Sequence, residues 1–198
     1  PRKEQSTRET FQRGERVRAY ILEVRKGSSG PQIIASRTHP GLVERLFEME
    51  VPEIYEGIIE IKGAVREPNG RAKIAVYSRD RAVDPIGACV GMRGVRVQSV
   101  VQELRGEKID IVQWSDDPAT FVGNALSPAK IYKINVNPDG RAMEVIVEDD
   151  QLSLAIGKKC QNVRLAAKLT KWRLDIKSRS EYEQGLRTTA EGALAGLT

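Results

Sequence analysis

The stretch Asp84-Pro85-Ile86-Gly87-Ala88-Cys89-Val90-Gly91-Met92-Arg93-Gly94 ends in a Gly-x-x-Gly turn and precedes an apolar pattern with helical spacing. A related stretch, Leu154-Ala155-Ile156-Gly157-Lys158-Lys159-Cys160, places its first turn glycine 66 positions later (157 − 91). Each helical pattern is followed by a short alternating strand, at 109–111 and at 174–176. A repeat at this spacing predicts two tandem domains and no solenoid.

The sequence before each turn repeats as well. Asn69-Gly70 and Asp139-Gly140 each lie between alternating apolar runs, which is a strong β-hairpin pattern. A predicted helix precedes each hairpin, at 41–50 and at 118–126, and a proline ends it. Each unit of about 70 residues therefore predicts the order helix–strand–strand–helix–turn–helix–strand. This order indicates an α+β chain of two tandem type II KH domains.

The turn between the two helices is suited to binding a polyanion. Glycine lacks a Cβ, so a phosphodiester backbone can approach it closely, and the amides at the next helix start favour phosphate. KH modules use this turn to clamp about four single-stranded nucleotides. The candidate RNA-binding residues are those of the two turns and of the helix starts after them: Gly91, Met92, Arg93, Gly94, Arg96, Gly157, Lys158, Lys159, Asn162 and Arg164.

The second turn is incomplete, because Cys160 occupies the place of its second glycine. One isolated Gly-x-x-Gly is more often a plain helix–helix turn, whereas two copies with cations inside favour RNA binding. The Cβ and thiol of Cys160 could hold an RNA backbone away. The sequence therefore leaves open whether the second turn contacts RNA.

Composition excludes several classes of protein. The 198 residues are 40% hydrophobic and 30% charged, which is a globular balance, and no apolar stretch reaches the length of a bilayer-spanning helix. Two cysteines and one histidine are too few for a zinc site or a disulfide scaffold. We expect no catalytic residues, no metal and no cofactor, and the low cysteine content favours the cytoplasm.

The charge is concentrated in separate segments. The net charge is +5, but residues 1–37 carry nine Lys or Arg against four Glu, and residues 150–179 carry eight against two Asp. Separated basic segments are typical of a surface that follows a polyanion. Solvated basic helices would give the same pattern, so charge alone does not decide between the two interpretations.

The sequence closely resembles the NusA family of bacterial transcription elongation, termination and antitermination factors, from about Gly14 to Lys177. The stretches that carry the resemblance are Ser36-Arg37-Thr38-His39-Pro40, Glu50-Val51-Pro52-Glu53-Ile54, Arg71-Ala72-Lys73-Ile74-Ala75-Val76, the first turn quoted above, Glu107-Lys108-Ile109-Asp110-Ile111-Val112, and Gln161-Asn162-Val163-Arg164-Leu165-Ala166. This chain departs from the family at two positions. Cys160 stands where the family usually has glycine, and Lys171 stands where a glycine commonly precedes the Trp, here Trp172.

The resemblance implies an S1-type OB-fold β-barrel followed by two KH domains packed into one continuous RNA-binding surface. We expect only the end of that barrel here, with strands at 15–25 and 31–36 and the first three strands missing. The implied division is the barrel end at 1–38, the first KH domain at 39–114, the second at 115–179, and a linker or frayed tail of little periodicity at 180–198.

The implied function is non-enzymatic. The chain would grip nascent single-stranded RNA and modulate RNA polymerase pausing, termination and antitermination. The resemblance implies contact with RNA polymerase mainly through an N-terminal domain absent from this chain. Other antitermination factors and a ribosomal protein are further implied partners. We expect a monomer with no membrane association.

Two other functions remain open at this point. KH and S1-type domains also accompany RNA-processing and RNA-degrading enzymes, although there the KH domain precedes the barrel. A protein–protein scaffold could instead use the acidic segment 38–60, which contains six glutamates. A catalytic domain upstream would favour the first alternative, and RNA affinity unchanged by Gly91→Asp with Gly94→Asp would favour the second.

Overall fold

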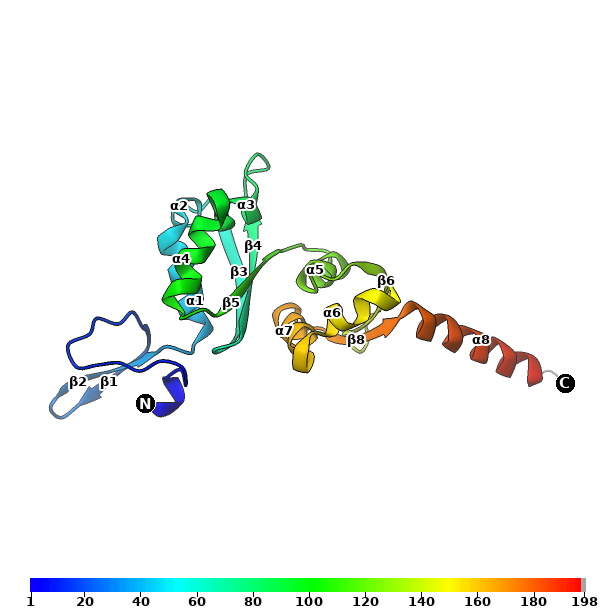
Figure 1. The fold of residues 1–198 in the computed structure, drawn as a ribbon, viewed down its shortest axis with the longest axis horizontal. Helices are drawn as coiled ribbons and strands as arrows, with labels where there is room; N and C mark the ends of the chain where they lie inside the picture. The colour runs from blue at the N-terminus through cyan, green and yellow to red at the C-terminus, as the bar shows by residue number, and fades with distance from the viewer. Residues whose placement is uncertain (197–198) are drawn as a thin grey trace. The chain divides into compact units, whose positions relative to one another are not determined.

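The computed structural model describes residues 1–196, and the chain divides into two compact units, with the boundary between Trp114 and Ser115 (Figure 1). After a short N-terminal segment, the first unit contains β1 (Tyr20–Gly27), β2 (Gly30–Ser36), α1 (Pro40–Glu50), α2 (Pro52–Tyr55), β3 (Ile59–Glu67), β4 (Arg71–Ser78), α3 (Pro85–Val90), α4 (Val95–Glu103) and β5 (Lys108–Gln113). The predicted element order of the first KH domain is therefore confirmed.

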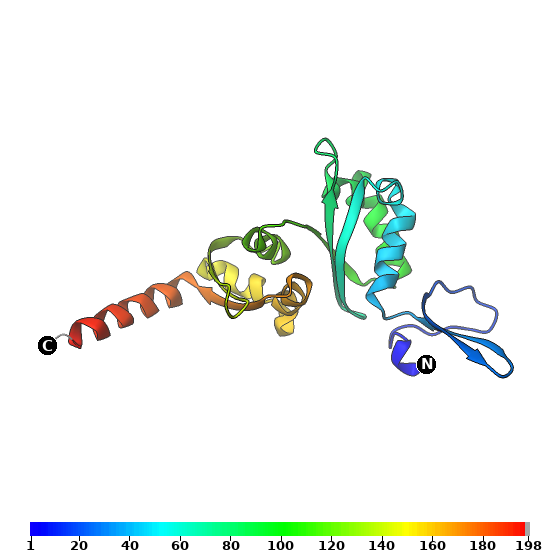
Figure 2. The same ribbon diagram turned by 180° about the vertical axis from the view of Figure 1, so that it is seen from behind.

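A three-stranded sheet of order β3-β4-β5 forms the base of the first unit. The β3–β4 pair is an antiparallel hairpin, and β4–β5 is parallel. A parallel pair needs a long crossover, which α3, the turn and α4 supply. Figure 2 shows α1 and α4 on the same face of this sheet. The turn is thus held between two helices that are both tied to the sheet.

The core of the first unit lies between this sheet and its helices. Phe47 of α1, Ile59 of β3 and Ile74 of β4 are all at most 1% exposed. Helix α1 buries Leu42, Val43, Leu46 and Phe47, whose spacing places them on one helical face. Its first turn is capped by His39, whose Nδ1 accepts a hydrogen bond from the Gly41 amide at 2.9 Å.

The N-terminal segment differs from its prediction in extent. The alternating residues from 15 predict a strand, but β1 begins only at Tyr20 and pairs with β2 alone. The buried guanidinium of Arg37 explains why the preceding residues take another path. It donates to the Glu9 carboxylate at 3.0 Å, to the Arg18 carbonyl at 2.8 Å and to the Glu103 carbonyl at 2.8 Å. These bonds fasten residues 9–18 to the end of α4.

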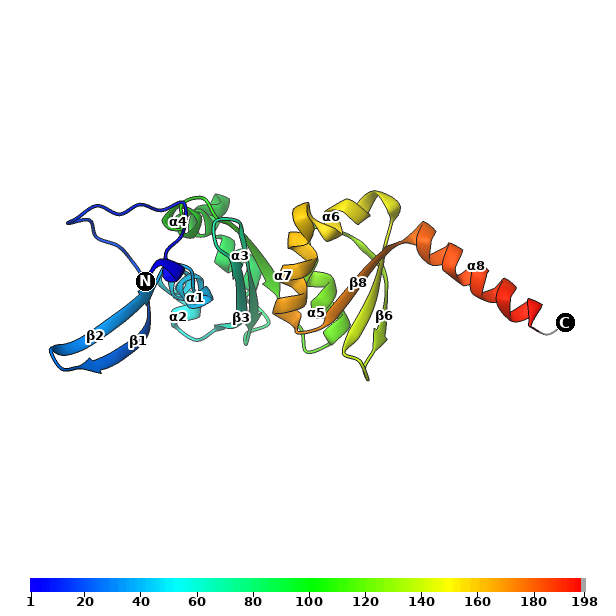
Figure 3. The ribbon, with the colours of Figure 1, turned by 90° about the horizontal axis from the view of Figure 1, so that it is seen from below.

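The second unit repeats the arrangement of the first. It contains α5 (Pro118–Ala125), β6 (Ile131–Asn137), β7 (Ala142–Val147), α6 (Leu152–Ile156), α7 (Gln161–Thr170), β8 (Arg173–Ser178) and α8 (Arg179–Ala195). The sheet order is β6-β7-β8, again antiparallel and then parallel. Figure 3 shows α5 and α7 together on one face of this sheet. The predicted α+β fold with two KH domains is confirmed.

The C-terminal segment departs from the sequence-based prediction. Little periodicity predicts a linker or frayed tail over 180–198, yet residues 179–195 form α8. A capping box starts this helix, because the Ser178 hydroxyl accepts from the Glu181 amide and the Glu181 carboxylate accepts from the Ser178 amide. The last two residues, 197 and 198, lie outside the described part of the chain.

Candidate nucleic-acid interface

The first Gly-x-x-Gly turn joins α3 to α4 by a left-handed path. Gly91, Arg93 and Gly94 have φ values of 75°, 52° and 76°. The Gly91 amide donates to the Gly87 carbonyl at 3.0 Å, and the Gly94 amide donates to the Gly91 carbonyl at 3.1 Å. Positive φ favours glycine, so the two glycines lower the cost of this path.

The second turn, between α6 and α7, has the same backbone. Gly157, Lys159 and Cys160 have φ values of 76°, 53° and 59°. The Gly157 amide donates to the Ser153 carbonyl at 2.9 Å, and the Cys160 amide donates to the Gly157 carbonyl at 3.1 Å. Cys160 therefore takes the left-handed conformation of Gly94, although a side chain opposes it.

Both turns are open to solvent. Met92 is 88% exposed, and Arg93, Lys158, Lys159 and Cys160 are all exposed. Within residues 1–196, no backbone acceptor is found for the amides of the two middle residues of either turn. Each turn thus presents unpaired amides together with one or two cations, which is the chemistry that binds phosphate oxygens.

Two of the candidate residues have side chains that are engaged within their own units. Arg96 Nη1 donates to the Ala88 carbonyl at 2.7 Å and to the Glu53 carboxylate at 2.9 Å. Asn162 is only 7% exposed, and its Nδ2 donates to the carbonyls of Leu126 and Ala155, both at 3.0 Å. The structure therefore directs these two side chains toward backbone carbonyls of the fold.

Arg164 differs from Arg96 and Asn162 in its exposure and in its hydrogen-bond partner. It is exposed on α7, and its Nη1 donates to the Lys159 carbonyl at 3.0 Å. The guanidinium thus lies beside the second turn and adds a positive charge there. Arg164 joins Lys158 and Lys159 as the basic group of the second turn, whereas the first turn contributes Arg93 alone.

Glu53 is the residue of this region that sequence reasoning missed. It belongs to α2, whose contribution to the turn cannot be inferred from local periodicity. Its carboxylate holds Arg96, and both side chains of this ion pair are about 30% exposed. The equal spacing of Arg96 from Gly91 and of Asn162 from Gly157 would have indicated a shared role for those two residues.

The two cysteines have opposite environments. Cys89, in α3, is wholly buried, and this burial, with the Glu53 carboxylate as a smaller cause, raises the pKa of its thiol to about 12. Cys160 is exposed in the second turn. Because the thiolate is the nucleophile, Cys89 is an unreactive core residue at neutral pH.

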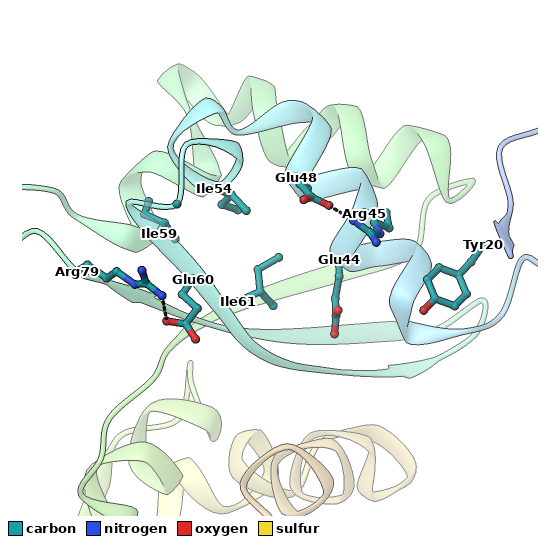
Figure 4. A pocket seen from close by; sticks show the side chains of 10 residues that line it. Tyr20, Glu44, Arg45, Glu48, Ile54, Ile59, Glu60, Ile61 and Arg79 are labelled. Atoms are coloured by element: carbon teal, nitrogen blue, oxygen red, sulfur yellow. Dashed lines mark hydrogen bonds and ion pairs between the residues drawn. The ribbon is translucent and has the colours of Figure 1, made fainter. Parts of the chain in front are cut away.

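A separate hollow of about 330 Å³ lies between α1, α2 and β3 (Figure 4). Its lining includes the apolar side chains of Ile54 and Ile61 and the carboxylate of Glu44. Two ion pairs complete it, Arg45 with Glu48 at 2.7 Å and Arg79 with Glu60 at 3.3 Å. Burial raises the pKa of Glu44 above its ordinary value.

Over residues 1–196, no cluster of three or more His, Cys, Asp or Glu side chains has the arrangement of a metal site. No described helix combines the length and apolar character needed to cross a bilayer.

Comparison with known families matches both units. Residues 37–114 match the NusA-like first KH domain, and residues 118–184 match the NusA-like second KH domain. These matches cover both turns and the helices around them.

Curated relatives match across nearly the whole chain. The transcription termination/antitermination protein NusA of Halalkalibacterium halodurans is 57% identical over 93% of this chain and 48% of the relative. The protein of the same name from Bacillus subtilis is 56% identical over 93% of this chain and 50% of the relative. That from Thermus thermophilus is 47% identical over 96% and 50%. The chain thus spans about half the length of these relatives.

A solved structure has a related fold. The crystal structure of APE1850 matches with a TM-score of 0.51 and 25% sequence identity, over 68% of this chain and 95% of that chain.

Proposed function

Because the chain belongs to the NusA family, we propose that it is an RNA-binding transcription factor that grips nascent single-stranded RNA and so modulates pausing, termination and antitermination by RNA polymerase. The observation that supports this most is the pair of exposed turns with one backbone geometry. Each turn offers amides without backbone acceptors, and each carries cations. The names of the relatives do not favour the alternative of a module from an RNA-processing enzyme.

The proposed RNA contacts divide into backbone and side-chain groups. Glycines at 91, 94 and 157 let the phosphodiester chain approach the amides, while Met92 offers an exposed apolar surface beside the first turn. The cations that would meet phosphates are those exposed at or beside the turns: Arg93, Lys158, Lys159 and Arg164. Phosphate contacts of this kind position RNA without reading its sequence.

Binding alone can produce the regulatory effect, since no bond needs to be made or broken. A protein that binds only single-stranded RNA stabilises the unpaired state of that RNA relative to its paired state, by mass action. Hairpins in nascent RNA form from such segments. Both turns belong to one chain, so once one turn holds the RNA, binding at the other becomes intramolecular.

The domain bounds and the protein partners are proposed from membership of the family. We propose a barrel end at 1–38, KH domains at 39–114 and 115–179, and a connecting segment from 180 onward. We also propose contact with RNA polymerase mainly through a further N-terminal domain, and with other antitermination factors and a ribosomal protein. The chain would act as a cytoplasmic monomer without catalytic activity.

The salt dependence of RNA binding tests this function. Each phosphate contact to a single strand contributes about −0.7 to the slope of log K against log salt, so four contacts give about −3. The measurement is fluorescence anisotropy of a labelled random-sequence RNA of about 12 nucleotides, long enough for the four that each KH turn clamps. An affinity that is flat between about 50 and 200 mM salt would contradict the proposal.

A further inference from the structure

The residue five positions after the first turn glycine occupies the same structural place in both units. Arg96 follows Gly91 by five positions, and Asn162 follows Gly157 by five. Each side chain reaches back to a carbonyl in the helix before the turn. Arg96 bonds Ala88 in α3 at 2.7 Å, and Asn162 bonds Ala155 in α6 at 3.0 Å. Two different side chains thus make one connection across the turn.

The turn glycines are fitted to these side chains. A Cβ on Gly91 would lie 2.7 Å from Arg96 Cγ, and a Cβ on Gly157 would lie 2.8 Å from Asn162 Cβ. Such distances are too short for carbon atoms. The first glycine of each turn therefore leaves the space through which the later side chain passes back to the preceding helix.

Each connection also reaches a third element. Arg96 extends to Glu53 of α2, and Asn162 donates to the Leu126 carbonyl at the end of α5. The helix before the turn, the helix after it and a helix from the start of the unit are thereby joined.

We propose that Arg96 and Asn162 are positioning residues, which hold each turn in its RNA-binding path without touching RNA, and that Glu53 positions the first turn through Arg96. This assignment rests on the proposed function for its RNA readout. It replaces the direct RNA contact that the sequence suggested for both residues.

The substitution Glu53→Gln tests this assignment, because two explanations predict opposite changes in RNA affinity. Removing a negative charge near a phosphate site should strengthen RNA binding if only long-range electrostatics matters. If Glu53 holds Arg96, Glu53→Gln should instead weaken binding by about two- to fivefold, the range of a partly exposed ion pair. The pair is partly exposed, so the variant should still fold.

Glu56→Gln is the matched control. It makes the same charge change three positions along the chain, at an exposed carboxylate for which the described residues offer no ion pair. Its RNA affinity should be unchanged or slightly higher. A fall with Glu53→Gln but not with Glu56→Gln would therefore report the loss of the bond to Arg96.

Arg96→Ala separates positioning from phosphate contact. A positioning residue should weaken RNA binding about tenfold, because a charged hydrogen bond is lost, and leave the salt slope unchanged. A phosphate-binding residue would lower the magnitude of the slope by about 0.7. In the double variant Glu53→Gln with Arg96→Ala, the losses of RNA affinity should not add, since both substitutions break the same connection.

The experiment titrates the labelled random-sequence RNA into the whole chain and into the variants Glu53→Gln, Glu56→Gln, Arg96→Ala and Arg93→Ala. Hydrogen exchange of the turn amides is measured on the same samples without RNA. Weaker binding with Glu53→Gln, together with an unchanged slope for Arg96→Ala and faster turn exchange, would support the proposal. An unchanged or tighter Glu53→Gln complex, or a reduced slope for Arg96→Ala, would overturn it.

Failure of the proposed function would look different. In that case Arg93→Ala would leave RNA binding unchanged, and only the exchange of the turn amides would still respond to Arg96→Ala. For the second unit, Asn162→Ala should also speed exchange in its own turn, and unchanged exchange there would overturn the assignment of Asn162.

Discussion

The two turns share a backbone but differ in chemistry. Gly94 and Cys160 have φ values of 76° and 59°, and in each turn the amide at this position bonds the first glycine. One turn has glycine and a single arginine, whereas the other has a cysteine and two lysines. The hydrogen bonds that cross each turn therefore fix its backbone path. The side chains of the turn residues then determine its charge and how closely RNA can approach.

The largest difference should appear when a carboxylate is placed at the equivalent position of each turn. A Cβ at Gly94 would meet nothing closer than 3.9 Å, and aspartate tolerates left-handed backbone. Gly94→Asp should therefore fold and weaken RNA binding by about tenfold or more, because like charges are brought together.

Cys160→Asp is the matched variant in the second turn. A comparable fall in anisotropy-measured affinity would show that the second turn contacts RNA. An affinity equal to that of the unsubstituted chain would restrict RNA contact to the first turn and break the proposed symmetry.

A smaller effect is expected when cations are removed. Arg93→Ala should lower the magnitude of the salt slope by about 0.7, and the double variant Lys158→Ala with Lys159→Ala by about 1.4. Lys108→Ala is the control and should leave the slope unchanged, because this exposed lysine at the start of β5 lies beyond the end of α4 that is opposite the first turn. Equal slopes for the double variant and the control would mean that the lysines of the second turn remain in solvent.

The strain at Cys160 can be measured through stability. A side chain in left-handed backbone costs about 1 kcal/mol, so Cys160→Gly should raise the free energy of unfolding by up to about that amount in urea titrations. The reverse change, Gly94→Cys, should lower it. RNA affinity should rise or stay the same with Cys160→Gly, and clear weakening would mean that the thiol itself contacts RNA.

The smallest perturbation uses the two thiols as they are. At neutral pH, iodoacetamide should modify Cys160 and leave Cys89 unmodified, since burial raises the pKa of Cys89 to about 12. Mass spectrometry of the alkylated peptides measures both rates. Bound RNA should slow the reaction at Cys160, and an RNA-independent rate would place the thiol outside the complex.

Local patterns were sufficient to predict most of the fold. Asn69-Gly70 and Asp139-Gly140 specify hairpins by their own backbone preferences, and the turn glycines indicate where two helices meet. The start of α8 was also encoded locally, since Ser178 and Glu181 have capping-box spacing, although the periodicity after them is weak. The path of residues 15–19 depends on the buried Arg37 and so could not be predicted locally.

The site was predictable in position but not in the role of every residue. The sequence placed Arg96, Asn162 and Arg164 together among the candidate RNA-binding residues. In the structure, Arg96 and Asn162 each bond a carbonyl of the helix before their own turn, five positions after its first glycine. Whether a side chain faces solvent or a carbonyl of the preceding helix depends on tertiary packing. The contribution of Glu53 depends in the same way on where α2 lies.

Ultraviolet crosslinking of the labelled RNA to the whole chain, with mass-spectrometric mapping of the modified peptides, most directly tests whether the exposed turns hold RNA. We expect crosslinks in the peptides that contain Met92 and Lys158, and their loss in Gly94→Asp and Cys160→Asp respectively. Crosslinks confined to peptides outside both turns, with the turn peptides unmodified at saturating RNA, would contradict this account.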